Sequence, residues 1–246
     1  MIRIFVPPEE LDKKREIKLA DDKAHYLSSV VRCKVGDVVE AIDGKGNAYK
    51  AAISGISQKD VFVDITSEVA LDAESALNIA ICQGILKGEK MDMVIQKTTE
   101  LGVKEIFPII TERCIVKETK KTKRWRKIAE EAAEQCGRTV VPTVHEPLEF
   151  SPWLMAHGTK QIKGFIFWEE GGISLKEAVI KIFPSPTHQL TNSPIHLFIG
   201  PEGGLTANEV DMAEKNGLIR TSLGKSILRA ETAAIVSVAM VKFLLE

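Results

Sequence analysis

The stretch Phe198-Ile-Gly-Pro-Glu-Gly-Gly-Leu-Thr206 decides the fold of the second half of this chain. An apolar run with strand character leads into a glycine-rich turn, and Thr206-Ala-Asn-Glu209 has the form of a capping box that starts a helix. Backbone amides are therefore presented at the carboxyl end of a strand, where open α/β sheets bind their ligands. Taken alone, two adjacent glycines favour a purely structural tight turn.

A second loop of the same kind follows about twenty residues later, Leu223-Gly-Lys-Ser-Ile-Leu-Arg229. It is not a nucleotide-binding P-loop, because that motif needs glycine at the position of Ile219. No G-x-G-x-x-G follows the early strands, so a Rossmann dinucleotide site has no support. Two successive strands that each end in a glycine-containing loop predict a pocket for an adenosine-sized ligand, held by backbone hydrogen bonds and aliphatic contacts.

From about residue 75 onward, apolar strand-like runs alternate with helical segments, which is typical of an α/β sheet. The expected strands are Ile79–Cys82, Glu105–Ile110, Gly164–Trp168, Ile195–Ile199 and Ile219–Leu223. The expected helices are Glu89–Leu101 ending at Gly102, Trp125–Cys136 ending at Gly137, and one starting at the capping box Ser174-Leu-Lys-Glu177. The last helix, roughly Ala230 to Leu245, is apolar on nearly every side, so we expect it to be buried between other elements.

Residues 1 to about 70 contain short strands separated by Gly/Asp turns, a pattern that suggests a small barrel. The expected strands are Arg3–Val6, Val38–Ile42, Ala48–Ile53 and Val61–Ile65. One helix interrupts them, Asp21–Arg32, with Tyr26, Leu27, Val30 and Val31 expected on one face. The acidic turn Leu71–Ser75 separates the domains, and the polar stretch Pro184–Pro194 is an internal loop.

Composition sets further limits. The formal net charge of −1 excludes a chain whose whole surface is basic, but it allows local basic patches for nucleic acid. The four cysteines lie far apart without a C-x-x-C pair or a histidine at metal-ligand spacing, which argues against a zinc site and a disulfide framework. With no secretory signal pattern and no long apolar stretch, we expect a soluble cytoplasmic protein that uses no metal and binds no membrane.

The two loops, extended to Leu223-Gly-Lys-Ser-Ile-Leu-Arg-Ala-Glu-Thr-Ala233, closely resemble those of the SPOUT superfamily of knotted methyltransferases. More narrowly, the chain resembles the ribosomal RNA small subunit methyltransferase E family, which makes N3-methyluridine in 16S rRNA. The supporting stretches span the chain: Arg3–Val6, His25–Leu27 with Val31-Arg32, Gly88–Asp92, Gln96-Lys97 with Glu100–Gly102, Thr111–Cys114 and Glu134–Arg138.

The resemblance implies an α/β protein with a PUA-like β-barrel over residues 1–70 and a SPOUT α/β domain over residues 71–246. A deep trefoil knot and the cofactor site are expected in about residues 163–246. The family acts as a homodimer on 16S rRNA or the assembled small ribosomal subunit, and the likeness suggests uridine 1498 as the target. Two alternatives stay open: a non-catalytic RNA-binding or ribosome-assembly protein, and a SPOUT methyltransferase acting on another RNA.

The implied cofactor is S-adenosylmethionine. Its expected contacts are Trp168, Glu169, Ile199, Gly200, Pro201, Glu202, Gly203, Gly204, Leu223, Gly224, Ile227 and Leu228. Methylation of uracil N3 removes a proton and spreads negative charge over O2 and O4, which Arg229 is expected to stabilise. Arg229 instead paired with Glu231 is the alternative. Glu202 is the nearest carboxylate for the proton, although a glutamate in the first turn of a helix is also ordinary capping chemistry.

Binding of RNA needs clustered cations even in a neutral chain. The family stretches suggest six contacts: Arg3, Arg32, Lys34, Lys87, Arg113 and Arg138. Arg138 follows a C-cap glycine and is equally suited to neutralise the helix end. The densest basic run is Lys117–Lys127, for which a solvated helix face is a nearly equal alternative. The histidines, His25, His145, His157, His188 and His196, are scattered without an evident catalytic pair, and His25 is expected to pack within its helix.

Overall fold

The structure is a computed structural model that describes residues 2–11, 16–70, 74–157, 162–184 and 193–246. The chain forms two compact units, Met1–Glu74 with Glu130–Val141 and Ser75–Ala129 with Pro142–Glu246. The expected boundary at residue 70 lies close to the end of the first segment, but no pattern along the chain indicates that residues 130–141 join it. Residues 71–73 of the acidic turn, residues 185–192 of the polar loop and His188 lie outside the described residues.

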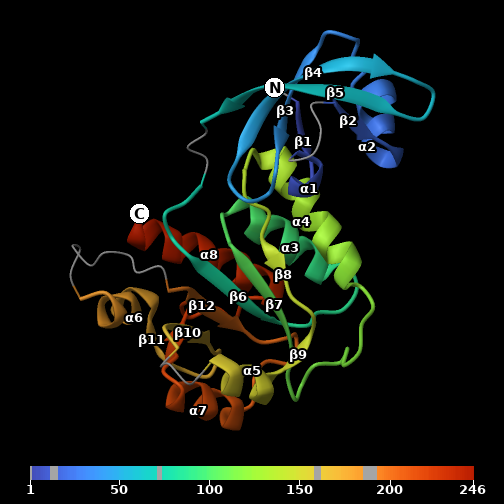
Figure 1. Cartoon of the computed structure of the whole chain (residues 1–246). Helices are drawn as coiled ribbons and strands as arrows, with labels where there is room; N and C mark the ends of the chain where they lie inside the picture. The colour runs from blue at the N-terminus through green and yellow to red at the C-terminus, as the bar shows by residue number, and fades with distance from the viewer. Residues whose placement is uncertain (1, 12–15, 71–73, 158–161, 185–192) are drawn as a thin grey trace. The chain divides into compact units, whose positions relative to one another are not determined.

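The first unit is built on a five-stranded sheet (Figure 1). Its order is β1 (Arg3–Phe5), β3 (Val38–Ile42), β4 (Ala48–Ile56), β5 (Val61–Val69) and β2 (Glu16–Leu19). β1 pairs with β3 in parallel and the other pairings are antiparallel. The sequence missed β2, since only Ile17 and Leu19 are buried in it and two apolar residues make too short a pattern. The described strands form an open sequence of pairings, so closure into a barrel stays a prediction.

The predicted helix at Asp21 exists but changes character midway. After the short α1 (Pro8–Leu11), α2 (Asp21–His25) continues as a π-helical turn, η1 (Tyr26–Val30), in which the Val31 amide donates to the Tyr26 carbonyl over 2.9 Å. A π turn is wider than an α turn, so side chains after it leave the 3.6-residue face. Leu27 is buried, but Tyr26 and Val30 are exposed, as is His25. The expected packing of these three side chains is therefore wrong.

The second unit is built on an eight-stranded sheet in which every recorded pairing is parallel. Along it lie β11 (Ile173–Ser174), β13 (Ile219–Ser222), β10 (Gly164–Phe167), β12 (Ile195–Ile199), β6 (Ile79–Gly84), β7 (Glu105–Ile110) and β8 (Thr143–Val144), with β9 (Leu148–Glu149) also on β7. All five predicted strands are confirmed. Each residue of β6, β10 and β12 is buried, as expected for parallel strands covered on both faces. The predicted trefoil knot stays a prediction.

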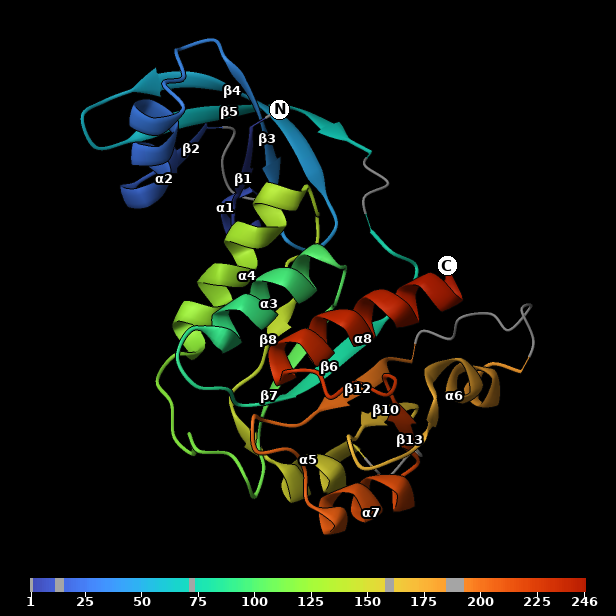
Figure 2. The same cartoon turned by 180° about the vertical axis from the view of Figure 1, so that it is seen from behind.

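Helices cover both faces of this sheet (Figures 1 and 2). α3 (Lys90–Glu100) and α8 (Ala230–Leu245) lie side by side on one face, while α5 (Phe150–His157) and α7 (Ala207–Lys215) cover the other. The remaining helices are α4 (Thr122–Cys136) and α6 (Leu175–Ile182). Gly102 and Gly137 have φ values of +93° and +85°, which confirms the predicted helix ends. Both predicted capping boxes are formed, at α6 and at α7.

α8 departs from its prediction. It buries one side, with Ala234, Ser237, Val238 and Val241, against α3, α6, β6 and β12. The described residues leave its other side uncovered, and Phe243 is 85% exposed. Burial between elements of the same chain is therefore wrong for this helix, because the sheet and its neighbouring helices reach only one of its apolar sides. Of the described residues, no helix is both long and apolar enough to cross a membrane.

Candidate active site

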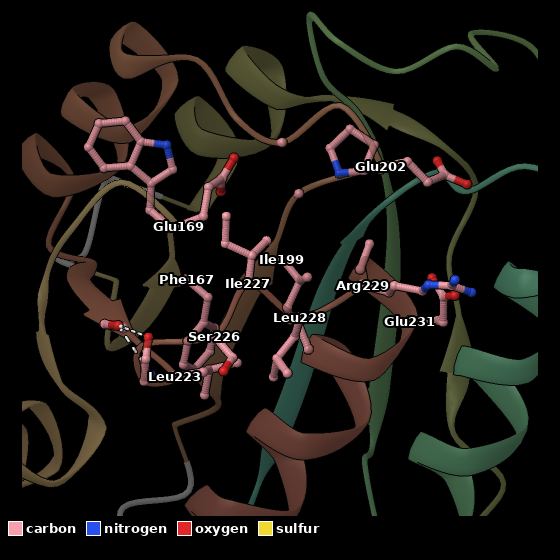
Figure 3. A pocket seen from close by; sticks show the side chains of 18 of the residues that line it. Phe167, Glu169, Ile199, Glu202, Leu223, Ser226, Ile227, Leu228, Arg229 and Glu231 are labelled. Atoms are coloured by element: carbon pink, nitrogen blue, oxygen red, sulfur yellow. Dashed lines mark hydrogen bonds between the residues drawn. The ribbon is translucent and has the colours of Figure 1, made fainter.

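A cavity of about 380 Å³ opens at the carboxyl ends of β10, β12 and β13, where the glycine loops were predicted to form a pocket (Figure 3). Its walls are the loop after β10, the loop from Gly200 to Gly204, the loop from Leu223 to Arg229 and the first turn of α8. The volume falls in the range of small-molecule sites. Three loops and one helix start therefore converge on a single pocket within the second unit.

The loop after β12 is fixed from below by the end of β6. Gln83 is fully buried, and its Nε2 donates to the carbonyls of Gly84 and Gly200 over 2.9 Å and 3.1 Å. A Cβ at Gly84 would lie only 2.5 Å from the backbone nitrogen of Pro201. Only glycine therefore allows the two chain segments to approach this closely. The position of the loop depends on contacts between residues more than one hundred positions apart in the chain.

Gly204 joins the loop after β12 to the loop after β10. Its φ is +72°, and a Cβ added there would lie 2.3 Å from Oε1 of Glu169. Glu169 thus lies directly against the glycine loop, and both residues line the cavity, as does Trp168. The predicted third loop is present at the pocket.

Gly203 does not follow the prediction. It is not one of the residues that line the cavity, and its missing Cβ faces Arg113, whose backbone oxygen and Cβ would each lie 3.0 Å away. Arg113 in turn donates from Nη1 to the carbonyls of Gly203 and Leu205 over 3.2 Å and 3.3 Å. Gly203 therefore leaves room for Arg113 behind the loop, and the expected cofactor contact is corrected to a supporting role.

The loop after β13 contributes aliphatic side chains and two cations, Lys225 and Arg229. Gly224 has a φ of +118°, and the hydroxyl of Ser222 accepts from its amide over 3.2 Å. Ile227 is 81% exposed although it lines the cavity with Leu228. Arg229 is the N-cap residue of α8, and its exposed side chain has no recorded ion pair or hydrogen bond among the described residues. The alternative in which Arg229 pairs with Glu231 is thus not what the structure records.

Three charged residues form one side of the pocket. Lys90 Nζ lies 3.3 Å from Glu202 Oε1 and 3.8 Å from Glu231 Oε2. The backbone amide of Lys87 also donates to Glu202 Oε1, over 3.0 Å. Partial burial of the Glu202 carboxyl favours its neutral form, but the amide of Lys87, its own amide and the Lys90 ammonium outweigh this and hold the pKa of Glu202 below its ordinary value. Glu202 is therefore an ionised residue that ties this loop to the start of α3.

Trp168 is held on the opposite side by a cation. The guanidinium carbon of Arg220 lies 5.0 Å from the Trp168 ring centroid, within the range of a cation–π contact. Arg220 also pairs with Asp211 and Glu214 on α7. The buried indole nitrogen of Trp168 has no hydrogen-bond partner in the described residues. The contact with Arg220 thus fixes the orientation of the ring.

The pocket unites nearly all the residues predicted for it. Trp168, Glu169, Ile199, Gly200, Pro201, Glu202, Gly204, Leu223, Gly224, Ile227, Leu228 and Arg229 all line the cavity. Sequence reasoning missed eight further lining residues: Lys90, Phe167, Ser222, Lys225, Ser226, Ala230, Glu231 and Ala233. Most of these adjoin the predicted loops, and widening each loop by one or two residues finds them. Lys90 had no such signal, since it comes from a helix more than one hundred residues upstream.

The predicted RNA contacts differ in how available they are. Lys87 and Arg113 are exposed and both belong to segments bonded to the loop after β12. In the first unit, Arg32 and Lys34 are exposed, whereas Arg3 Nε pairs with Glu40 over 2.7 Å.

The sixth predicted contact, Arg138, is contradicted by its burial. It is only 3% exposed, and its guanidinium pairs with Glu74 over 2.9 Å. Glu74 Oε1 also accepts from the amides of Thr139 and Val140, over 3.0 Å and 2.9 Å. An enclosed, paired guanidinium cannot reach a phosphate, so Arg138 organises the chain after α4 and is not an RNA contact.

Several residues of the basic run Lys117–Lys127 form ion pairs or hydrogen bonds inside the second unit. Arg124 pairs with Asp92 over 2.9 Å, Arg126 with Glu146 over 2.9 Å, and Lys121 donates to the Gly88 carbonyl over 3.1 Å. Trp125 is buried and donates its indole N–H to Asp92. These contacts favour a helix face that anchors α4 to α3.

Three of the histidines that looked scattered lie together. Phe107 stacks on His145 with ring centroids 4.0 Å apart, Trp153 stacks on His157 at 4.4 Å, and His196 lies 5.3 Å from Trp153. Burial lowers the pKa of His196 to about 4. The cluster surrounds the amino-terminal part of β7 and β12, away from the cavity. In the part of the chain described, no group of three His, Cys, Asp or Glu side chains is arranged to hold a metal ion.

Comparison with known proteins places this architecture in a family. The family described as RNA methyltransferase domain matches residues 73–242, and that described as RNA methyltransferase PUA domain matches residues 19–66. The ribosomal RNA small subunit methyltransferase E of Buchnera aphidicola is 32% identical over 96% of this chain and 90% of that protein. The protein of the same name from Bacillus subtilis is 29% identical over 99% of this chain and 96% of its own length.

Solved structures agree. The ribosomal RNA small subunit methyltransferase E of Neisseria gonorrhoeae, bound to S-adenosylmethionine, superposes with a TM-score of 0.86 at 32% identity and covers 99% of this chain and 98% of that one. A putative methyltransferase of Legionella pneumophila, also with bound S-adenosylmethionine, gives 0.85 at 31% identity, with 98% and 97% covered. With its two matched domains, full-length relatives and shared fold, this chain belongs to the ribosomal RNA small subunit methyltransferase E family.

Proposed function

We propose that this protein transfers the methyl group of S-adenosylmethionine to N3 of a uridine in 16S rRNA of the small ribosomal subunit, with uridine 1498 as the expected target. The observation that carries the proposal is the cavity at the carboxyl ends of β10, β12 and β13, whose walls are the glycine loops. Relatives named for methylation of small-subunit RNA, and structures of this fold that hold S-adenosylmethionine, support it.

The pocket suits the cofactor for reasons visible in this chain. Glycine at Gly84 lets the Pro201 backbone approach closely, and Gly204 adopts a φ of +72°, so backbone amides and carbonyls of these loops can face a ligand directly. Ile199, Leu223 and Leu228 provide the aliphatic contacts that an adenine ring requires (Figure 3). When bound, S-adenosylmethionine supplies an electrophilic methyl group on a sulfonium. The loops hold that cofactor in place, so that the acceptor nitrogen can approach in line with the bond that breaks.

Arg229 is proposed to stabilise the charge that develops on the uracil. As N3 loses its proton, negative charge spreads to O2 and O4, and a permanently charged planar guanidinium can donate to such oxygens. The side chain is exposed, lines the cavity and is not committed to a carboxylate in the described residues. Those are the properties of a group kept for a substrate.

Glu202 enters the proposal as a weaker candidate for the proton acceptor. Its carboxylate already accepts from the Lys87 amide and lies beside Lys90, and its pKa is lowered. A carboxylate stabilised in its ionised form is a weaker base. Its established contacts suit the positioning of the loop better than proton transfer.

RNA binding is assigned to the exposed cations Lys87 and Arg113 in the second unit and Arg32 and Lys34 in the first. Lysine and arginine neutralise phosphates without reading sequence, and this term supplies most non-specific affinity. Arg3 is retained as a candidate, although its pairing with Glu40 must be exchanged for a phosphate. The net charge of −1 means that affinity depends on these few local contacts.

A homodimer, a closed PUA-like barrel and a trefoil knot belong to the same proposal. The uncovered apolar side of α8, with Met240 and Phe243 exposed, supports a second copy at that helix. A charge placed there, Phe243→Glu, is expected to convert a dimer into monomers in light scattering after size exclusion.

Two assays in sequence test the function. Calorimetry should show that the protein binds S-adenosylmethionine and its demethylated product at one site per chain. Incubation with methyl-labelled cofactor should then label small subunits that lack the modification, and leave large subunits unlabelled. If the protein binds the cofactor but the label appears in another RNA, the result would favour a methyltransferase that acts on a different RNA. Absence of cofactor binding would favour the non-catalytic RNA-binding alternative and refute the proposal.

A further inference from the structure

Glu231 is the least accessible carboxylate at the cavity. It lies in the first turn of α8 and is 8% exposed, yet it lines the cavity. Its Oε2 is buried and accepts no hydrogen bond from the described residues. The nearest recorded cation, Lys90 Nζ, lies 3.8 Å away, which is an ion pair but is beyond hydrogen-bond length. The pocket wall thus holds a carboxylate oxygen without a hydrogen-bond donor.

A buried oxygen of this kind destabilises the folded protein unless a hydrogen-bond donor reaches it. A buried acceptor without a donor destabilises a protein by roughly 1–3 kcal/mol, and more when it is charged. The first turn of α8 and the Lys90 ammonium, 3.8 Å away, both lie beside this oxygen. They do not supply the missing hydrogen bond. A ligand N–H in the cavity supplies it once the Glu231 side chain turns Oε2, which is closed to solvent in this structure, toward the cavity.

The neighbouring carboxylate shows the contrast. Glu202 accepts a hydrogen bond from the Lys87 amide over 3.0 Å and one from Lys90 over 3.3 Å, so its Oε1 is satisfied without any ligand. Both carboxylates share the same lysine and line the same cavity. Of these two carboxylates, only Glu231 has an oxygen that is buried and without a hydrogen-bond partner among the described residues. The two glutamates therefore have different tasks, one structural and one directed at the cavity.

We propose that Glu231 is the proton acceptor of the methyl transfer and that Lys90 positions it; this rests on the function proposed above. The N3–H of the target uracil donates to Glu231 Oε2, and the proton passes to that carboxylate as N3 attacks the methyl carbon. The C–S bond of the sulfonium breaks and its electron pair stays on sulfur. The products are neutral N3-methyluracil, the neutral thioether and a protonated Glu231, which releases its proton to solvent.

The charges around Glu231 fit this task. Lys90, from α3, lies 3.8 Å from the Glu231 carboxylate. Arg229, two residues earlier, lies on the same side of the cavity in Figure 3 and is free to bind the uracil oxygens. Glu202 shares Lys90 with Glu231. Glu169 and Lys225 are the remaining charged residues that line the cavity. A base and a charge-stabilising cation thus flank one ligand position.

The test compares Glu231→Gln with Glu202→Gln in single-turnover methyl transfer to unmodified small subunits, at saturating cofactor, as a function of pH. General-base catalysis contributes about 10²–10⁴-fold, so Glu231→Gln should lower the rate by roughly that factor at neutral pH. The rate of the variant should rise about tenfold per pH unit into the alkaline range, where solvent removes the N3 proton, while the wild-type rate levels off. Glu231→Asp should recover part of the rate.

Binding measurements on the same variants separate this role from others. Calorimetry should give Glu231→Gln the cofactor affinity of the wild type, and its thermal midpoint should stay close to that of Glu149→Gln, an exposed control on β9. Loss of cofactor affinity in Glu231→Gln would assign the residue to cofactor binding and overturn the proposal. So would an unchanged rate, or an altered pH profile in Glu202→Gln alone. If the wild type itself transfers no methyl group, the proposed function fails, which is a distinguishable result.

Discussion

The amino ends of the parallel strands form one edge of the eight-stranded sheet, the amino edge, and their carboxyl ends form the other, the carboxyl edge. Polar groups have different surroundings at these two edges. At the amino edge, Glu105 and His145 pair over 2.9 Å, and His157 and His196 lie among Phe107 and Trp153. At the carboxyl edge, Arg229 has no recorded partner among the described residues, and Glu231 Oε2 lacks a hydrogen bond. The amino edge packs rings against rings. The carboxyl edge keeps an open cavity with glycines at its closest approaches.

This difference indicates that the amino edge contributes mainly to the stability of the fold, whereas the carboxyl edge holds the proposed active site. Titratable residues occur at both edges, so their presence alone does not identify a site. At the amino edge, burial and the neighbouring His157 lower the pKa of His196 and favour its neutral form. At the carboxyl edge, charged side chains line a cavity. Substitutions at the carboxyl edge should therefore change cofactor affinity or turnover, whereas substitutions at the amino edge should change stability.

The largest effect is expected from Gly204→Val. The side chain would meet Glu169 and would require a residue with φ of +72°, which β-branched residues avoid. We expect cofactor affinity to fall by more than about 100-fold in calorimetry, since the two loops can no longer close on each other. Gly36→Ala, with φ of +94° and open space around it, is the control for backbone strain alone. Affinity close to the wild-type value in Gly204→Val would show that the loops tolerate separation.

Arg229→Ala should act on methyl transfer and spare cofactor binding. Removing one group that stabilises charge in a transition state lowers turnover by roughly 10²–10³-fold. The cofactor affinity should change little, because backbone groups and aliphatic side chains are proposed to make the adenosyl contacts. Arg229→Lys should restore only part of the rate, since an ammonium cannot donate in a plane to two oxygens. Turnover within twofold of the wild type would remove Arg229 from the mechanism.

At the amino edge, His196 predicts a stability change that is independent of activity. The pKa of His196 is about 4 in the folded chain, whereas an ordinary histidine, as in the unfolded chain, has a pKa of 6.5. The unfolded state therefore binds a proton more tightly. The free energy of unfolding should fall as pH decreases from 6.5 to 4, with His196 contributing up to about 3 kcal/mol of that loss. Denaturant titrations across this range should show a shallower decline in His196→Phe. An identical pH dependence in the variant would contradict the assignment.

The smallest effect is expected for a single phosphate contact. Lys87→Ala should weaken binding to small-subunit RNA by a few-fold and reduce the slope of log affinity against log salt by about one. Lys176→Ala, an exposed lysine on α6, is the matched control. A salt slope equal to that of the wild type would show that Lys87 does not meet a phosphate.

The sequence predicted the carboxyl edge of the sheet far better than the amino edge. Phe198–Thr206 and Leu223–Arg229 carry glycines, turns and caps in one continuous stretch each, so local patterns contain most of the pocket. Lys90 and the His145–His157–His196 cluster are assembled from distant segments, and spacing along the chain carries no sign of them. Arg138 was misassigned for the same reason, since its partner Glu74 lies sixty-four residues away.

Helix packing was predictable only in part. Helix ends at Gly102 and Gly137 and the capping boxes at Ser174 and Thr206 are local and were correct. The face of the helix after Asp21 was wrong because the π turn changes the residue spacing, which hydrophobic periodicity does not reveal. For α8, an apolar surface on nearly all sides predicted burial, but the described residues cover only one of its sides.

The central claim is that the cavity at the carboxyl edge directs a methyl group to uracil N3. The most direct test uses cofactor with a deuterated methyl group and small subunits that lack the modification, followed by nucleoside mass spectrometry and mapping of the labelled fragment. The account predicts deuterium-labelled N3-methyluridine at a single position of 16S rRNA. Label in a different nucleoside, in several positions, or in none would contradict it.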